Sequence, residues 1–325
     1  MFSNYTCSQC PQYSNIQPLE NSGLSVCCNF GFLSYEHWPL PGTDRVHRNC
    51  EPQCIQAHNN VVEVATFFTD VLNYRPYNGT EAHNVTRPYY TCSINCVETP
   101  GNIEWRYAAW LDKYKQVIFG QCHVNGQLRS LATVIDIVAH EFFHGLNYQV
   151  VDFQYYGESG ALDESYADIF GILVANFQNN DIGTWNWEIG SGFGSNDRAV
   201  RNLSDPGSYG QPEHMRDYRL VTDDHGGVHT NSGIHNIAAY NLLTSQDSQG
   251  NYLFDAMSGA MLFYKALYDL SEQSGFTDSR RAIEQAAKTL FRRDYAQPET
   301  LQAILQAIAT AFDNVGIGDN IGIFE

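Results

Sequence analysis

Positive charge is scarce in this chain of 325 residues, which has 18 lysines and arginines against 36 aspartates and glutamates and a formal net charge of −18. Sequence-independent binding of nucleic acid depends on basic patches, and none is visible in the sequence. Anionic membrane surfaces are disfavoured for the same reason. No run of about eighteen apolar residues occurs, so no transmembrane helix is predicted. We therefore expect no nucleic acid and no membrane among the partners, and we expect a monomer.

The amino terminus, MFSNYTCSQCPQYSN, lacks the basic and apolar regions of a secretory signal peptide. Cysteine is missing from residues 123–325, whereas all nine cysteines lie within residues 7–122. This clustering favours local disulfide bonds in an oxidising compartment, and the odd number leaves at least one thiol unpaired in a monomer. A second zinc site built from CSQC and CC is the alternative. We expect a secreted, extracellular protein whose signal peptide and any propeptide are absent from this chain.

The expected secondary structure changes near residue 150. Residues 1–60 predict loops and short strands, and residues 86–121 predict strands. Helical spacing of apolar residues predicts helices over 58–75, 132–147, 160–178, 232–245, 256–271, 279–291 and 298–313, the last beginning at QPET. We predict an α+β fold with a β-rich, cysteine-rich lobe (1–149), a mainly helical lobe (150–325) and a cleft between them that holds the functional site.

The stretch VIDIVAHEFFHGLNYQ, residues 134–149, carries two histidines on an apolar helix. His140 and His144 lie on one helix face, about 6 Å apart along the axis, and can reach one tetrahedral zinc. Glu141 points about 100° away from His140, so its carboxylate can reach a metal-bound water without binding the metal. The alternative is a buried helix with two structural histidines. A catalytic zinc site also needs a third protein ligand.

A second stretch, YYGESGALDESYADIFG at 155–171, offers that ligand. Glu164 and Asp168 are four residues apart on one helix face. A helix packed against the first one could present Glu164 to the metal and Asp168 to the back of a histidine, whose second N–H usually donates to a carboxylate or carbonyl. Acidic pairs on helices are mostly solvated, but the apolar neighbours of this pair favour a partly buried face.

Four motifs, HEFFH, GALDESYADIFG, LSDPGSYGQPEH and GGVHTNSGIHNIAAY, resemble those of the thermolysin-like neutral metalloproteases, in order from about residue 57 to 317. The first fifty or so residues are unlike that family. The resemblance implies a β-rich lobe, a helical lobe and a zinc cleft between them. It also implies a zinc-dependent metalloendopeptidase that binds one catalytic Zn²⁺ and acts on proteins and peptides.

The resemblance further implies the metal-binding residues. The implied zinc ligands are His140, His144 and Glu164. Zinc lowers the pKa of its bound water to roughly neutral, and Glu141 would act as general base and later as proton donor. Asp168 would accept a hydrogen bond from His140, and Asp163 would do so for His144.

Other residues implied by the resemblance contact the substrate. His229 and Tyr155 would stabilise the tetrahedral oxyanion, with Asp224 orienting His229. Arg201 would hold the substrate carbonyl near the primed side. Losing one oxyanion donor typically costs on the order of a hundredfold or more in rate.

The implied substrate-binding residues include an edge strand, YAAW at 107–110, in which Ala108 and Trp110 are kept and Tyr107 replaces an Asn. The pocket for the residue after the scissile bond would be lined by Leu128, Leu131, Ile137, Ile189 and Val200. Because these side chains are all apolar, we predict cleavage before Leu, Phe, Ile or Val.

The sequence departs from the family at its calcium sites. Asp136 and Glu188 match calcium ligands, but Ala175, Asn186 and Ser191 stand where carboxylates are usual. Calcium prefers about six to eight oxygens with several carboxylates, so we expect no double calcium site and at most one weak site.

The sequence FGQCHVNGQ at 119–127 is a second departure, because it replaces a Gly-Asp-rich loop. It would bring Cys122 and His123 near the cleft, either as an extra disulfide or as a variant loop.

Two other functions compete with the endopeptidase. A non-catalytic binding protein would have no chemical reason to keep Glu141, His229, Tyr155, Asp224 and Arg201 together. A zinc aminopeptidase would need acidic groups for a free amine, for which only Glu104 and Asp112 are candidates near the edge strand.

Overall fold

The structure, a computed structural model, describes residues 24–28, 52–74, 90–94, 105–111, 116–292 and 298–318. It divides into two compact units. Unit 1 comprises Met1–Gln149 and Gly190–Ala199, and unit 2 comprises Val150–Ile189 and Val200–Glu325. The disulfide prediction concerns cysteines whose side chains lie outside the described part, with the exception of Cys122. No helix in the described ranges is long and apolar enough to span a bilayer.

A five-stranded sheet forms much of unit 1. Its strands are β1 (Leu24–Cys28), β2 (Tyr90–Ile94), β3 (Trp105–Leu111), β4 (Gln116–Val124) and β5 (Gln127–Ser130). β1, β2 and β4 are parallel neighbours, whereas β3 and β5 pair with β4 in the antiparallel sense. The strands predicted between 86 and 121 are confirmed by β2, β3 and most of β4.

The segment 119–127 forms most of a β-hairpin, so the interpretation as a variant loop was wrong. β4 and β5 are joined by Asn125 (φ 50°) and Gly126 (φ 76°), both left-handed. An Asn-Gly pair favours this two-residue turn because both residues tolerate positive φ. Cys122 lies in β4 and is 1% exposed, while His123 is half-buried in the same strand.

Two helices accompany the sheet in unit 1. α1 (Pro52–Thr66) continues into a π-helical stretch, Phe67–Val71, and α2 (Ile135–Val150) carries the two histidines. α1 begins at Pro52 rather than at the predicted residue 58, since proline is well suited to the first helical turn. The buried Asn60 side chain donates to the Ala132 carbonyl at 2.9 Å, which ties α1 to the turn before α2.

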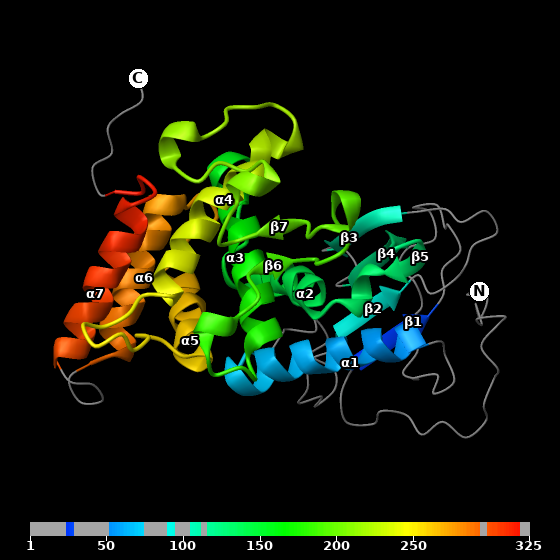
Figure 1. Cartoon of the computed structure of the whole chain (residues 1–325), viewed down its shortest axis with the longest axis horizontal. Coiled ribbons are helices and arrows are strands. Elements are labelled where there is room, and N and C mark those ends of the chain that lie inside the picture. The colour runs from blue at the N-terminus through cyan, green and yellow to red at the C-terminus, as the bar shows by residue number, and fades with distance from the viewer. Residues whose placement is uncertain are drawn as a thin grey trace. The chain divides into compact units, whose positions relative to one another are not determined.

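Unit 2 is mainly helical. Its helices are α3 (Gly157–Asn176), α4 (Asp224–Leu243), α5 (Ala256–Ala266), α6 (Phe276–Leu290) and α7 (Pro298–Asp313), and its short strands are β6 (Glu188–Ile189) and β7 (Arg201–Asn202). Every helix predicted between 160 and 313 is present. α3 packs against α4, and α6 packs against both α5 and α7 (Figure 1). Large aromatic side chains fill this core, with Tyr166, Phe170, Phe263, Phe276 and Phe312 all less than 2% exposed.

The first turn of α4 departs from helical geometry. Asp224, His225, Gly226 and Gly227 all have positive φ, between 50° and 84°. Position 227 has no room for a side chain, because a Cβ added at Gly227 would lie 2.9 Å from the Asn231 side chain. The regular helix therefore begins after the glycines, and the Gly-rich turn expected from DDHGGVH is part of the same element.

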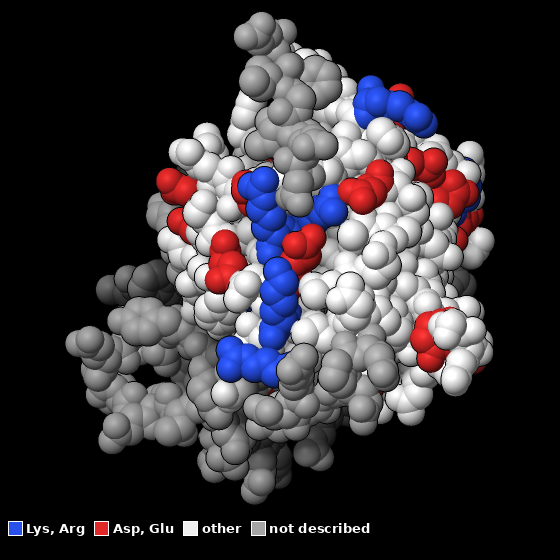
Figure 2. Space-filling view, turned by 90° about the vertical axis from the view of Figure 1, so that its left-hand side faces the viewer, with Lys and Arg blue, Asp and Glu red and all other residues white. Residues whose placement is uncertain are grey.

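Charges on α6 are paired locally. Arg280 contacts Glu284 at 3.3 Å and Asp313 of α7 at 2.6 Å, and Arg281 lies 3.9 Å from Asp278. Figure 2 shows a face of the molecule on which a row of basic side chains has acidic side chains beside it. Of these ion pairs, the one between Arg280 and Asp313 links α6 to α7.

Candidate active site

The two histidines of α2 converge through their ring nitrogens. The Nε2 atoms of His140 and His144 are 3.2 Å apart, and the ring planes meet at 84°. His140 is 6% exposed and the neighbouring Glu141 is 7% exposed. This is the one-face arrangement that the i, i+4 spacing predicts for a helix.

α2 packs closely against an aromatic side chain of β3. A Cβ added at Gly145 would lie 2.9 Å from the Trp110 ring. Glycine in a helix costs about 1 kcal/mol relative to alanine, so its presence here is explained by the close approach of the indole. Trp110 thus has a packing contact next to His144 in addition to the substrate contact predicted for it.

α3 carries three buried carboxylates, those of Asp163, Glu164 and Asp168, which are 5%, 2% and 0% exposed. The interpretation of a partly buried acidic face was therefore correct. Among the described residues, the group of His, Cys, Asp and Glu side chains able to hold a metal ion is His140, His144 and Glu164, whose ligand atoms lie within 4.8 Å of one another.

This donor set fits zinc. Two nitrogens, each about 2.1 Å from a tetrahedral zinc, would be about 3.4 Å apart, close to the Nε2 separation in α2. Two imidazoles and one carboxylate are also a ligand set of catalytic zinc sites, which keep a fourth position open.

The Tyr155 hydroxyl lies beside the third ligand. It donates a short hydrogen bond to Glu164 Oε1 and lies 3.4 Å from His229 Nε2. Tyr155 is 38% exposed, in contrast to Glu164. His225 adds an aromatic contact, with its ring centroid 5.3 Å from that of Tyr155. The sequence interpretation gave His225 no role, and its place before two glycines in DDHGGVH was the available signal.

Asp224 holds His229 through two hydrogen bonds. Its Oδ1 accepts from His229 Nδ1 at 2.6 Å, and its Oδ2 accepts from the His229 backbone N–H at 3.0 Å. The left-handed turn places the carboxylate over the start of the regular helix, where backbone N–H groups need acceptors. The His229 side chain is 48% exposed, so its Nε2 can meet a ligand from solvent.

Arg201 is paired with Asp168. Its Nε donates to Asp168 Oδ2 and a terminal nitrogen donates to Oδ1, both at 2.7 Å. The carboxylate is fully buried and the Arg201 side chain is only 13% exposed. The sequence reasoning proposed a role for each residue and missed this bidentate pair, which has no local signal because 33 positions separate the two residues.

The predicted substrate-binding residues lie on several elements. Ala108 and Trp110 are in β3, half-buried, beside Tyr107, which is 51% exposed. Leu128, Leu131 and Ile137 belong to unit 1, whereas Ile189 and Val200 belong to unit 2. Ile137 and Ile189 are buried and Val200 is 38% exposed. A common pocket formed by these five side chains stays a prediction.

The predicted calcium ligands have protein partners. Asp136 Oδ1 accepts from the Gly190 backbone N–H at 2.8 Å, and Glu188 Oε1 accepts from the Tyr209 hydroxyl at 3.3 Å. Asp136 therefore anchors the segment Gly190–Ala199 within unit 1. A single weak calcium site stays a prediction.

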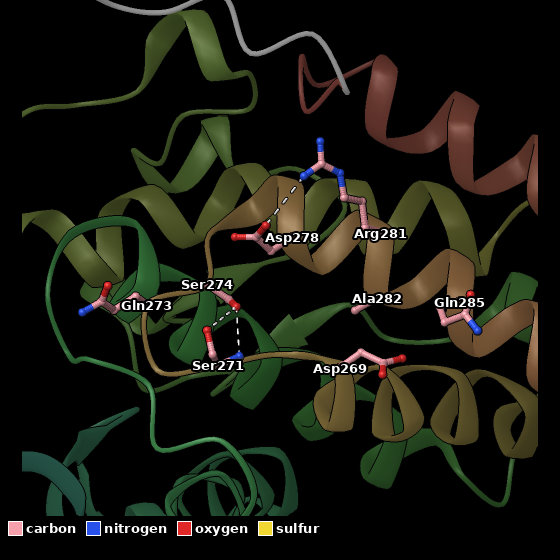
Figure 3. Close-up of a pocket in the computed structure, with 8 residues that line it drawn as sticks. All are labelled: Asp269, Ser271, Gln273, Ser274, Asp278, Arg281, Ala282 and Gln285. Atoms are coloured by element: carbon pink, nitrogen blue, oxygen red, sulfur yellow. Dashed lines mark hydrogen bonds and ion pairs between the residues drawn. The ribbon is translucent and has the colours of Figure 1, made fainter.

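Unit 2 also has a polar pocket away from these residues. Its volume is about 420 Å³, and it lies along the α5–α6 connection and α6 (Figure 3). The lining residues are Asp269, Ser271, Gln273, Ser274, Asp278, Arg281, Ala282 and Gln285. None of the predicted site residues is among them.

Comparison with known proteins agrees with this geometry. Residues 40–147 match the family model of the thermolysin metallopeptidase catalytic domain, and residues 151–317 match that of the thermolysin metallopeptidase alpha-helical domain. The chain therefore belongs to the thermolysin metallopeptidase family, whose members use a catalytic zinc ion.

Individual relatives are moderately similar. The chain is 31% identical over 271 residues to bacillolysin of Bacillus amyloliquefaciens, and the aligned region covers 80% of this chain and 46% of the relative. It is 34% identical over 214 residues to an extracellular elastase of Staphylococcus epidermidis, and the aligned region covers 65% of this chain and 37% of the relative. The chain thus spans half or less of the length of these relatives.

A solved structure confirms the fold. The precursor of protealysin, a metalloproteinase from Serratia proteamaculans, superposes with a TM-score of 0.70 at 23% identity, covering 94% of this chain and 91% of that chain. The predicted α+β fold, with a strand-containing N-terminal part and a helical C-terminal part, is confirmed.

Proposed function

We propose that this protein is a zinc-dependent metalloendopeptidase that hydrolyses proteins and peptides. The observation that carries the proposal is the group of His140, His144 and Glu164, with Glu141 on the same helix as the two histidines. A buried helix with two merely structural histidines would not explain the buried carboxylate that completes the ligand set.

Glu141 is the proposed general base. When bound, zinc lowers the pKa of water and polarises the substrate carbonyl as a Lewis acid. The Glu141 carboxylate accepts the proton that the attacking water loses, and later delivers it to the leaving amine nitrogen. The near-complete burial of Glu141 strengthens its electrostatic interactions at that point.

The proposed oxyanion donors are His229 and Tyr155. Asp224 accepts from His229 Nδ1 and so fixes the ring orientation, which leaves Nε2 as the proposed donor to the oxyanion. The Tyr155 hydroxyl, which lies 3.4 Å from that nitrogen, is proposed to turn its one hydrogen from Glu164 to the same oxygen. Asp163 and Asp168 are proposed to orient His144 and His140, and Arg201 to hold the substrate carbonyl on the primed side.

The proposed specificity is for an apolar residue after the scissile bond. Leu128, Leu131, Ile137, Ile189 and Val200 are all apolar, and burial of a matching side chain would contribute about 1.5–3 kcal/mol. Ala108 and Trp110 of β3 are proposed to pair with the substrate backbone.

The wider assignments follow from the same argument. We propose two domains, residues 1–149 and residues 150–325. The segment Gly190–Ala199 belongs to the second range in sequence but packs in unit 1. Extracellular location is supported by the clustered cysteines and by the relative named as an extracellular elastase. A monomer without nucleic acid or membrane partners is supported by the acidic composition.

Hydrolysis of quenched peptides tests this proposal. We would compare three substrates with the same chromophores: an N-blocked peptide with Leu after the scissile bond, the same peptide with Asp there, and an unblocked peptide with Leu. Each is measured with and without a zinc chelator, and with zinc restored.

The expected result is chelator-sensitive cleavage of the N-blocked Leu peptide, with the Asp peptide cut much more slowly. Cleavage of the unblocked peptide alone would establish an aminopeptidase instead. The candidate acidic groups for binding its free amine, Glu104 and Asp112, lie outside the described residues. Zinc binding without cleavage of any peptide would support a non-catalytic binding protein.

A further inference from the structure

A row of buried polar side chains extends from Arg201 into the core of unit 2. Asp168 accepts the two bonds from Arg201 and a third from Asn236 Nδ2 at 2.9 Å. Asn236 Oδ1 in turn accepts from the Ser165 hydroxyl at 2.7 Å. Asp168, Asn236 and Ser165 are all 0% exposed.

The row continues through His235. Its Nδ1 lies 2.7 Å from the Ser165 hydroxyl, and its Nε2 lies 2.9 Å from the Ser279 hydroxyl. Ser279 is also 2.9 Å from the hydroxyl of Tyr166. His235 and Ser279 are 0% exposed, as is Tyr166. An unbroken hydrogen-bonded row therefore joins α6, α4 and α3 to Arg201 of β7.

Counting protons gives this row one direction. The Asp168 carboxylate is an acceptor only, so Asn236 presents its amide nitrogen to it and its oxygen to Ser165. Ser165 has one hydrogen and donates it to that oxygen, so the Ser165 oxygen must accept from His235 Nδ1–H. The neutral ring then has Nε2 as an acceptor, which receives the hydrogen of Ser279, and Ser279 accepts from Tyr166.

Aromatic packing keeps His235 neutral. The ring stacks on Tyr166 and Phe276, with centroids 5.5 and 5.7 Å away, and meets Phe312 edge-on. Burial lowers the pKa of His235 from 6.5 to about 3. Among the described contacts of His235, the other titratable group is Tyr166, whose pKa burial raises. His235 is thus an uncharged donor at Nδ1 throughout the physiological range.

We propose that His235 is a positioning residue for Arg201, acting through Ser165, Asn236 and Asp168. This inference rests on the proposed function, because it gives Arg201 the task of holding the substrate carbonyl. The Nδ1–H of His235 fixes the Ser165 hydroxyl, which orients the Asn236 amide and thereby the carboxylate that binds the guanidinium. A rotated carboxylate would turn Arg201 away from its substrate position.

Two substitutions at His235 separate the hydrogen bond from the packing. His235→Asn keeps an N–H donor at the position of Nδ1, whereas His235→Leu fills the space without one. Ser165→Ala breaks the same link with little change in volume, and it serves if His235→Leu does not fold. Tyr166→Phe is the matched control, because it removes a hydroxyl at the far end of the row and leaves the link from His235 to Arg201 intact.

The first measurement is activity-independent. In ¹⁵N-resolved NMR spectra of the wild-type protein, we expect His235 as a single neutral tautomer with the hydrogen on Nδ1 from pH 8 to pH 5. The Nε–H signal of Arg201 should be protected from exchange in wild type, His235→Asn and Tyr166→Phe, and lose protection in His235→Leu and Ser165→Ala. A hydrogen on Nε2, or unchanged Arg201 protection in both of the last variants, would overturn the proposal.

The second measurement is peptide hydrolysis. In His235→Leu and Ser165→Ala we expect KM to rise about tenfold with kcat within about twofold, the size of a coupling between residues of one network. His235→Asn and Tyr166→Phe should keep the wild-type KM. In an Arg201→Ala background, His235→Leu should have no further effect. Equal KM values in all variants would contradict the proposal, whereas absence of cleavage by the wild type, with the NMR results as expected, would count against the peptidase function alone.

Discussion

The metal-binding residues and the proposed oxyanion donors are held in opposite ways. His140 and Glu164 lie within regular helices and are 6% and 2% exposed. Tyr155 lies just before the start of α3 and is 38% exposed. His229 lies in the first turns of α4, and its side chain is 48% exposed. Ligands that must meet one ion benefit from rigid, buried helix faces, whereas groups that meet a substrate must be reachable from solvent.

The difference extends to the backbone. The α2 histidines need only the i, i+4 spacing of an ordinary helix. His229 depends on four consecutive residues with positive φ, which turn the Asp224 carboxylate back onto it. Left-handed backbone at Asp224 and His225 is unfavourable for residues with a side chain, so this turn stores strain at the proposed site.

Among the variants that test this contrast, the largest effect should come from breaking the Asp224–His229 pair. We expect His229→Ala and Asp224→Asn each to lower kcat on the order of a hundredfold to a thousandfold, because one oxyanion donor is lost or misdirected. Zinc content should stay at one ion per chain, since neither residue is a ligand. Steady-state kinetics with metal analysis measures both.

Asp223→Asn is the matched control for Asp224→Asn, one position away and without a side-chain hydrogen bond at the start of α4. It should keep the wild-type rate. Full activity of Asp224→Asn would contradict the role of the left-handed turn.

A smaller effect, on stability, should distinguish the two kinds of backbone. Gly145→Ala pushes a methyl group against Trp110 in a regular helix. This overpacking should lower the free energy of unfolding by about 1–3 kcal/mol, and the higher helix propensity of alanine should offset about 1 kcal/mol of that loss. Gly227→Ala meets both a positive φ and the Asn231 side chain, so it should lower the free energy of unfolding by about 2 kcal/mol or more.

Urea unfolding measures both of these variants, and Trp110→Phe provides the control. In that background the cost of Gly145→Ala should shrink, because the smaller ring leaves room, whereas the cost of Gly227→Ala should not change. Identical costs for Gly145→Ala in both backgrounds would show that the Trp110 contact does not explain the glycine.

The smallest effect concerns Glu158, whose Oε1 accepts from the Phe276 backbone N–H at 2.7 Å at the start of α6. Burial raises the pKa of Glu158 above 4.5, with Asp278 adding to the increase and the Phe276 bond opposing it. The folded state therefore binds the proton more tightly than the unfolded state, and the free energy of unfolding falls as the pH rises from 4.5 through the raised pKa.

Glu158→Gln should abolish this contribution while keeping an oxygen for Phe276. Urea unfolding across pH 4 to 8 should show the variant gaining stability relative to wild type as the pH rises. A difference between the two proteins that is constant with pH would contradict the raised pKa.

The same contrast explains what the sequence could predict. The zinc helix and the helices of unit 2 followed from apolar spacing, and QPET marked the start of α7. The hairpin after β4 was missed although Asn125-Gly126 carried a local signal. The Arg201–Asp168 pair and the row through His235 have no local signal, because hydrogen bonds over 33 to 113 positions depend on how the helices pack.

The catalytic roles came from the family resemblance rather than from pattern. The spacing of apolar residues predicts no role for Tyr155, Asp224 or His229, so they were identified by the match of the family motifs along the chain. In the structure Asp224 is hydrogen-bonded to His229, and Tyr155 is hydrogen-bonded to Glu164. The pocket for the residue after the scissile bond stays a prediction.

The most direct test of this account is the Glu141→Gln variant, measured for zinc content and for hydrolysis of the N-blocked Leu peptide. The account predicts one bound zinc and a rate lowered about 10²- to 10⁴-fold, because the base is lost and the ligands are intact. Wild-type hydrolysis by a zinc-loaded Glu141→Gln protein would contradict the assignment of Glu141 and the mechanism built on it.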